Sequence, residues 1–121
     1  MLINISNHPS ENWSGKQFEA AVNNYGEILD LPFPQIDPDL QKEDIIAFAG
    51  CYAAQITALL KNKKGTSAVH LMGEQTFCYC LVELLKEKNI TVIASTTKRI
   101  AENRPDGSKV VKFSFCKFRE Y

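Results

Sequence analysis

Three short clusters of polar side chains could form a binding or catalytic site in this chain. Each cluster follows a run of apolar residues that has the character of a buried strand. The clusters comprise Ser6, Asn7, His8 and Ser10, then Gly73, Glu74, Gln75 and Thr76, and finally Ser95, Thr96, Thr97, Lys98 and Arg99. They combine hydroxyl, amide, imidazole and basic groups, which suit a small anionic ligand such as a phosphate ester.

The residue types within these clusters suggest separate roles. A turn at Gly73 would leave backbone N–H groups free at the start of a helix, where the helix dipole favours an anion. Lys98 and Arg99 would add positive charge, and a guanidinium can hold two phosphate oxygens at once. His8 could transfer a proton near neutral pH. We therefore expect His8, Lys98 and Arg99 to be catalytic, and the remaining hydroxyls, amides and backbone groups to bind the ligand.

Several of these residues also have a structural interpretation. Ser95–Thr97 could satisfy the backbone at a strand end, and His8 could be held by a backbone carbonyl. Glu74 would repel a phosphate if it pointed inward, so we expect it to stabilise the first turn of a helix. His70, inside an apolar strand, is expected to be structural. The phenylalanines near the C-terminus are expected to pack on the sheet, although they could stack on bases.

Motifs for cofactor or metal chemistry are missing from the sequence. The chain has no glycine-rich phosphate loop ending in Lys-Ser or Lys-Thr, no dinucleotide fingerprint and no serine nucleophile elbow. Its two histidines are far apart, and Cys78 and Cys80 would point in different directions from one helix. We therefore expect no cofactor and no metal, and metal-independent chemistry if a phosphodiester is cleaved.

Strands and helices alternate along the chain, and their order determines where the polar clusters lie. Strands are predicted over residues 1–6, 27–31, 68–72, 90–94 and 111–115, and helices over 14–25, 37–61 and 74–88. Right-handed crossovers make the first four strands parallel. The expected fold is an α/β, Rossmann-like three-layer sandwich with the sheet order 2-1-3-4 and an antiparallel C-terminal edge strand beside strand four. Ligands bind such sheets at the carboxyl ends of the strands, where the strand order reverses.

Capping and turn residues mark the ends of these elements. Ser14 with Gln17 three residues later fits a capping box, and Gly26 should end that helix. Asp37, which precedes a proline, is the expected N-cap of the next helix. Arg104–Gly107 has proline and glycine where a turn prefers them.

Length and composition indicate one domain over residues 1–121. Of the 121 residues, 45% are hydrophobic and 23% charged, which excludes a disordered chain, a collagen-like fibre and a disulfide miniprotein. Fourteen basic residues balance fourteen acidic ones, so we expect no duplex nucleic acid as partner. The chain shows neither a signal peptide nor an apolar run of about 18 residues. We therefore expect no membrane partner, and a cytoplasmic location with reduced cysteines.

Four segments of the chain carry a family resemblance. They are residues 1–10, 69–77, 94–99 and 118–121, which read MLINISNHPS, VHLMGEQTF, ASTTKR and FREY. Together they resemble small CRISPR-associated proteins that are standalone, single-domain relatives of the CRISPR-associated Rossmann-fold (CARF-like) sensors. The resemblance spans nearly the whole chain.

This resemblance implies a role in type III CRISPR antiviral signalling. Sensors of this group bind cyclic oligoadenylate across a homodimer, and those called ring nucleases cleave it. Cleavage needs no metal, because the 2′-hydroxyl of the ligand attacks the neighbouring phosphate while the protein holds the ring in line. The three polar clusters match the ligand-binding loops of the family. Their basic content is modest, because two copies of Lys98 and Arg99 only just balance the four charges of a cyclic tetranucleotide.

Two other functions fit the same sequence. The chain could be a non-catalytic interaction module of a defence system that docks through the strand Phe113–Phe118. It could also be a small phosphohydrolase or transferase that acts on nucleotides or sugar phosphates in the same cleft.

Overall fold

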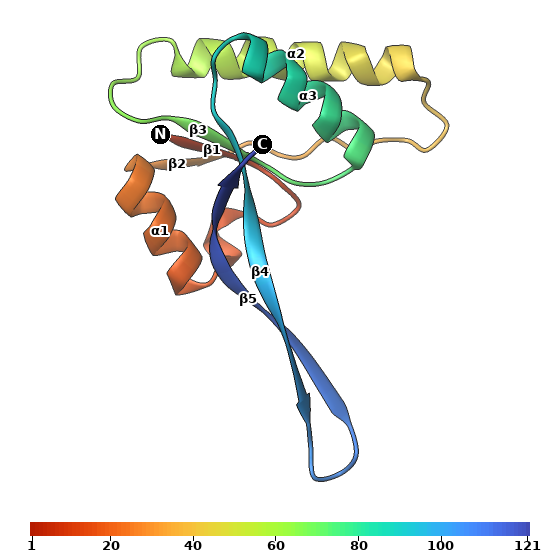
Figure 1. Cartoon of the computed structure of the whole chain (residues 1–121). Helices are drawn as coiled ribbons and strands as arrows, with labels where there is room; N and C mark the ends of the chain where they lie inside the picture. Colours follow the sequence, from red (N-terminus) through yellow and green to blue (C-terminus); the bar gives the residue numbers. More distant parts are fainter.

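A five-stranded mixed sheet forms the centre of the computed structural model, which describes residues 1–121 (Figure 1). The strand order is β2-β1-β3-β4-β5, and the first four strands are parallel while β5 runs antiparallel to β4. The strands are β1 (Leu2–Ile5), β2 (Ile28–Asp30), β3 (Ala68–Leu71), β4 (Val92–Asn103) and β5 (Lys109–Glu120). The predicted α/β class, the order 2-1-3-4 and the antiparallel C-terminal edge strand are therefore confirmed.

Helices cover both faces of the sheet and complete three layers. Helix α1 (Gly15–Tyr25) lies on one face, and α2 (Lys42–Leu60) and α3 (Gln75–Glu87) lie side by side on the other (Figure 1). Because β1 and β3 are buried on both faces, all four positions of each strand are inaccessible to solvent. The larger core cluster fills the space between the sheet and α2–α3, and a smaller one lies under α1.

The ends of the helices follow local capping chemistry. The Ser14 side chain accepts a hydrogen bond from the Gln17 backbone, which is one half of the predicted capping box, and Gly26 ends α1 with a φ of 86°, as predicted. The second helix begins at Lys42, several residues later than predicted. The Asp37 carboxylate instead accepts a hydrogen bond from the Asp39 N–H at 2.8 Å and closes a local turn. A reciprocal pair of hydrogen bonds between Gln41 and Asp44 caps α2.

Strands β4 and β5 are much longer than predicted. Paired from Ile93–Glu120 to Asn103–Lys109, they form a twisted two-stranded ribbon that projects beyond the sheet (Figure 1). We call residues 97–114 the arm. The prediction that strand four ends at residue 94 is therefore wrong, because the two strands satisfy each other's backbone groups beyond the body of the domain. The predicted turn at Arg104–Gly107 is present at the tip of the arm.

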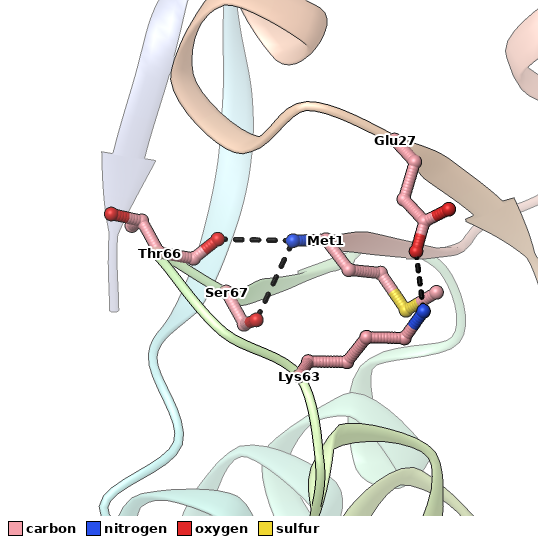
Figure 2. Close-up of polar contacts among 5 residues, drawn as sticks. All are labelled: Met1, Glu27, Lys63, Thr66 and Ser67. Atoms are coloured by element: carbon pink, nitrogen blue, oxygen red, sulfur yellow. Dashed lines mark hydrogen bonds and ion pairs between the residues drawn. The ribbon is translucent and has the colours of Figure 1, made fainter.

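Contacts of the first residue join the amino ends of the central strands β1 and β3 (Figure 2). The amino group of Met1 donates to the Thr66 carbonyl at 3.0 Å and lies 3.5 Å from the Ser67 hydroxyl. Nearby, Lys63 and Glu27 form an ion pair at 2.6 Å, and the lysine lowers the pKa of the glutamate through a hydrogen bond. Both side chains are exposed, so this pair contributes little to stability.

Helix α2 is long and apolar enough, by length and composition alone, to cross a membrane. A core helix of a soluble protein meets the same criterion, so this is weak evidence for a span. Four residues of α2 are buried in the protein: Ile45, Ala49, Ala53 and Ile56. The chain forms a small α/β fold in which α2 is part of the core.

Candidate functional site

A row of polar side chains crosses four strands on the face covered by α1. Asp30 on β2, Asn4 on β1, His70 on β3 and Ser95 on β4 lie in this order across the sheet. Asn4 is in register with both Asp30 and His70. Two residues earlier on their strands, Leu2, Ala68 and Ile93 pack in the apolar cluster under α1. Because side chains two apart on a strand share a face, the polar row continues this face toward the carboxyl ends of the strands.

Short hydrogen bonds connect the whole row. Asp30 Oδ1 accepts from Asn4 Nδ2 at 2.7 Å. The Asn4 carbonyl oxygen lies 2.8 Å from His70 Nδ1, and His70 Nε2 lies 3.0 Å from the Ser95 hydroxyl. Asn4 Nδ2 also donates to the His8 carbonyl at 3.0 Å. The row is therefore a continuous chain from a carboxylate to a hydroxyl.

The orientation of Asn4 determines the tautomer of His70. The Asn4 amide nitrogen lies between two acceptors, so its oxygen must face the imidazole. An oxygen can only accept, and His70 Nδ1 must therefore carry the proton. Nε2 is then an acceptor, and the Ser95 hydroxyl can donate to it.

His70 is almost completely enclosed, with 2% of its surface exposed. The Trp13 ring contacts it edge-on with 5.2 Å between ring centroids, and Phe118 lies at 5.8 Å. Burial lowers the pKa of His70 to about 4, because the charged imidazolium would lose its hydration. The ring is therefore neutral at neutral pH.

Asp30 behaves differently at the other end of the row. Burial alone would raise its pKa, but hydrogen bonds from Asn4 and Ser10 outweigh this effect and hold the pKa below its usual value. Ser10 donates to the carboxylate through both its backbone N–H at 3.0 Å and its hydroxyl at 2.7 Å. Asp30 is thus a carboxylate at neutral pH.

A cleft of about 510 Å³ opens above this row. It lies at the carboxyl ends of β1 and β3, which is the point where the strand order reverses. Its lining residues are Ser6, Asn7, His8, Asn12, Trp13, Ser14, Gln17, His70, Met72, Gly73, Ser95, Thr97, Phe113 and Phe115. Hydroxyl, amide and aromatic groups therefore form its walls, and no carboxylate does.

The structure brings part of the predicted site together in this cleft. One or more residues from each predicted cluster line it, namely Ser6, Asn7, His8, Gly73, Ser95 and Thr97. The other predicted residues lie outside its lining, namely Ser10, Glu74, Gln75, Thr76, Thr96, Lys98 and Arg99. The third cluster lies within β4, and not in a loop after it as predicted, because β4 continues to Asn103.

The start of α3 does not offer free N–H groups where they were expected. The Glu74 carboxylate caps this helix and accepts hydrogen bonds from the backbone of Thr76 at 3.2 Å and of Phe77 at 2.8 Å. These hydrogen bonds lower the pKa of Glu74. The expectation that Glu74 stabilises the first turn is confirmed. The same contacts use N–H groups that a phosphate at this helix end would need, so the site has to be placed elsewhere in the cleft.

The two basic residues of the third cluster point to opposite faces of the arm. Arg99 is directly opposite Phe113 in the register, and Phe113 lines the cleft. Lys98 is opposite Ser114, so its side chain lies on the other face. Arg99 is therefore on the cleft side of the arm, and Lys98 points away from it.

The groups at the floor of the cleft were not predicted as part of the site. His70 was expected to be structural, and Asn4, Asp30 and Trp13 were not considered for the site. A signal was present, because Asn4 and His70 are the only polar residues within two otherwise apolar strands. Their pairing, however, depends on the strand register, which no local pattern encodes.

Gly73, at the edge of the cleft, allows a close approach of an aromatic ring. A Cβ atom at this position would overlap the Phe33 ring, which packs edge-on against Phe77 with 5.2 Å between centroids. We expect Gly73→Ala to lower the free energy of unfolding by about 1–3 kcal/mol through overpacking. Urea titration measures this change. In a Phe33→Ala background the same substitution should cost much less, and an equal cost in both backgrounds would exclude this steric cause.

Together, these features define an α/β protein with a ligand-sized cleft at the carboxyl edge of a mainly parallel sheet. The chain belongs to the uncharacterized protein MJ1673 family, whose family model matches residues 1–119. It is similar to the uncharacterized protein MJ1673 of Methanocaldococcus jannaschii, with 36% identity over 66 residues, which cover 52% of this chain and 51% of that protein. The chain therefore spans about half the length of this curated relative. No solved structure matches the chain.

Proposed function

We propose that the cleft binds a cyclic oligoadenylate second messenger and that two copies of the chain share one ring, in a type III CRISPR antiviral system. The observation that carries this proposal is the position of the cleft, which lies where the strand order of the sheet reverses. Hydroxyls, amides and aromatic rings surround the cleft. Its volume of about 510 Å³ falls within the range of small-molecule sites. Anionic phosphates would meet no carboxylate on its walls.

Aromatic side chains at the rim provide surfaces for adenine bases. Phe113 is 68% exposed and does not pack on the sheet, in contrast to the expectation, whereas Phe115 and Phe118 pack as expected. Trp13 lines the same cleft. Unstacked bases bind to such rings. Arg99, on the cleft side of the arm, is placed to hold a phosphate beside a base stacked on Phe113.

Metal-independent cleavage is the finer part of this proposal. The 2′-hydroxyl of the ligand would attack the adjacent phosphate, with His8 at the cleft wall and Arg99 on the arm as the nearby catalytic groups. Lys98 is left out of this mechanism, because its side chain lies on the opposite face of the arm. A cytoplasmic location belongs to the same proposal, and all four cysteines are free, as a reducing compartment requires.

Calorimetry with cyclic tri-, tetra- and hexa-adenylate tests the proposal. We expect one of these rings to bind with a stoichiometry of one ring per two chains. Phe113→Ala should weaken binding roughly 5- to 150-fold, because stacking of a base on an aromatic ring contributes about 1–3 kcal/mol. Arg99→Ala should weaken it about tenfold or more through loss of a charge-assisted hydrogen bond.

Lys98→Ala is the matched control for Arg99→Ala. It removes one positive charge from the neighbouring position but on the opposite face of the arm, so the affinity should stay nearly unchanged. No heat with any ring would refute the proposal. Equal losses in Lys98→Ala and Arg99→Ala would show that the arm attracts the ligand only through its net charge.

The arm also favours a second function, that of an interaction module. Its exposed apolar side chains include Ile100 and Val111, and a two-stranded ribbon of this kind is only marginally stable without a packing partner. A partner protein that copurifies with the chain, together with a cleft that binds no ring, would favour this alternative.

A further inference from the structure

We propose that Ser95 is a nucleophile activated by His70, and that the cleft hydrolyses an ester at this hydroxyl. The proposal goes beyond ligand binding and does not depend on a cyclic oligoadenylate. Nucleophilic serines are recognised by a base within hydrogen-bond distance and a third group that orients the base. Here Ser95 Oγ lies 3.0 Å from His70 Nε2, and Asn4 Oδ1 lies 2.8 Å from His70 Nδ1.

The hydrogen bonds hold the imidazole in the form that this chemistry needs. Asn4 accepts from Nδ1–H, so Nε2 has a free lone pair directed at Ser95. The Ser95 hydroxyl also lies 3.1 Å from the Met72 sulfur, which is a weak acceptor. The hydroxyl proton is therefore shared chiefly with His70.

The hydrogen-bonded row offsets part of the cost of the charge that forms on the buried His70 ring during the reaction. When Nε2 takes the proton, the imidazolium would face the Asn4 oxygen, and the Asp30 carboxylate behind it polarises the same amide. Trp13 and Phe118 pack edge-on against the ring and enclose most of it, while the ring still lines the cleft from which water can enter. Asn4 and Asp30 act here as positioning residues, because neither touches the reacting atoms.

The reaction is balanced without any further reagent except water. Ser95 Oγ forms a bond to the phosphorus or carbonyl carbon of the ester, and its proton moves to His70 Nε2. The bond from that centre to the ester oxygen breaks, and the leaving oxygen takes the proton from Nε2. Water then attacks the serine ester, His70 accepts its proton, and Ser95 Oγ regains a proton as the acid is released.

The position of Ser95 makes the hydroxyl accessible to such a substrate. Ser95 lines the cleft together with Gly73 and Thr97, and His70 lines its floor with only 2% of its surface exposed. Phosphoric and carboxylic esters share the electrophilic centre that this pair would attack, and the cleft walls carry no carboxylate that would repel an anionic one.

A fluorophosphonate probe tests the proposal on the intact protein without any nucleotide. We expect a covalent adduct whose site, mapped by peptide mass spectrometry, is Ser95. Ser95→Ala should abolish labelling, and His70→Gln should slow it by roughly 100-fold or more, the usual contribution of a positioned base. Circular dichroism spectra of both variants confirm that they remain folded.

Ser114→Ala provides a matched control, because Ser114 lies on the face of the arm opposite the cleft and should not affect labelling. Turnover of bis-p-nitrophenyl phosphate or of p-nitrophenyl acetate then identifies the ester class. An adduct at another residue, no adduct, or equal labelling of folded His70→Gln would overturn the proposal. Labelling of Ser95 without turnover of either ester would overturn its hydrolytic step. None of these results depends on whether a cyclic oligoadenylate binds.

Discussion

Phe77→Ala should lower the free energy of unfolding by about 3–5 kcal/mol, which is a large part of the stability of a small domain. Phe77 has no exposed surface. Its ring packs edge-on against Phe33 and Tyr52, with centroids 5.2 and 5.3 Å away. Removal of the ring leaves a cavity between α3, α2 and the loop after β2, and the surrounding side chains can fill it only in part. Urea denaturation followed by circular dichroism measures the change.

Tyr79→Ala is the control for this substitution. It removes an aromatic ring from the same helix, but Tyr79 is 65% exposed and should affect stability little. A loss for Phe77→Ala that is no larger than the loss for Tyr79→Ala would contradict the packing described for α3.

The second large effect is a loss of stability between about pH 6.5 and pH 4 that originates from one buried histidine. The pKa of His70 is lowered to about 4 from an ordinary value of 6.5. In this window the unfolded chain binds a proton at residue 70 and the folded chain does not, so stability falls as the pH falls. A difference of about 2.5 pH units corresponds to a contribution on the order of 3 kcal/mol.

Urea titrations of the wild-type protein and of His70→Gln at several pH values isolate this effect. The carboxylates are common to both proteins, so the difference between the two stability curves reports residue 70 alone. We expect the difference to change in the window from pH 6.5 to 4 and to be constant above it. A constant difference across the window would show that His70 is accessible to solvent.

The arrangement of the central strands could be predicted because local patterns determine it. The apolar runs that form β1 and β3 are too short for helices. Because strands and helices alternate along the chain, the crossovers between the parallel strands are right-handed. These constraints lead to the order 2-1-3-4, and the order places the cleft between the ends of β1 and β3. Ser6, His8 and Gly73 could therefore be assigned to one cleft from the sequence, and all three line it.

The arm could not be predicted in the same way. Thr97, Arg99 and Glu102 are polar and exposed, and an isolated reading of this segment suggests a loop. The segment is a strand because β5 pairs with it along its whole length. This pairing also separates Lys98 from Arg99, since neighbours on a strand face opposite ways. Of the predicted basic pair, Arg99 therefore lies on the cleft side of the arm and Lys98 on the far side.

Hydrophobic periodicity and chain connectivity can be read from the sequence, so the fold class, the strand order and the edge of the sheet at which a cleft forms could be predicted. Which polar groups meet at this edge depends on the packing and register of the folded chain. Asp30, Asn4, His70 and Ser95 come from four strands that are distant in the chain, and the parallel register aligns them into one hydrogen-bonded row. The burial that makes His70 a neutral acceptor likewise comes from Trp13 and Phe118, which only the folded chain brings to it.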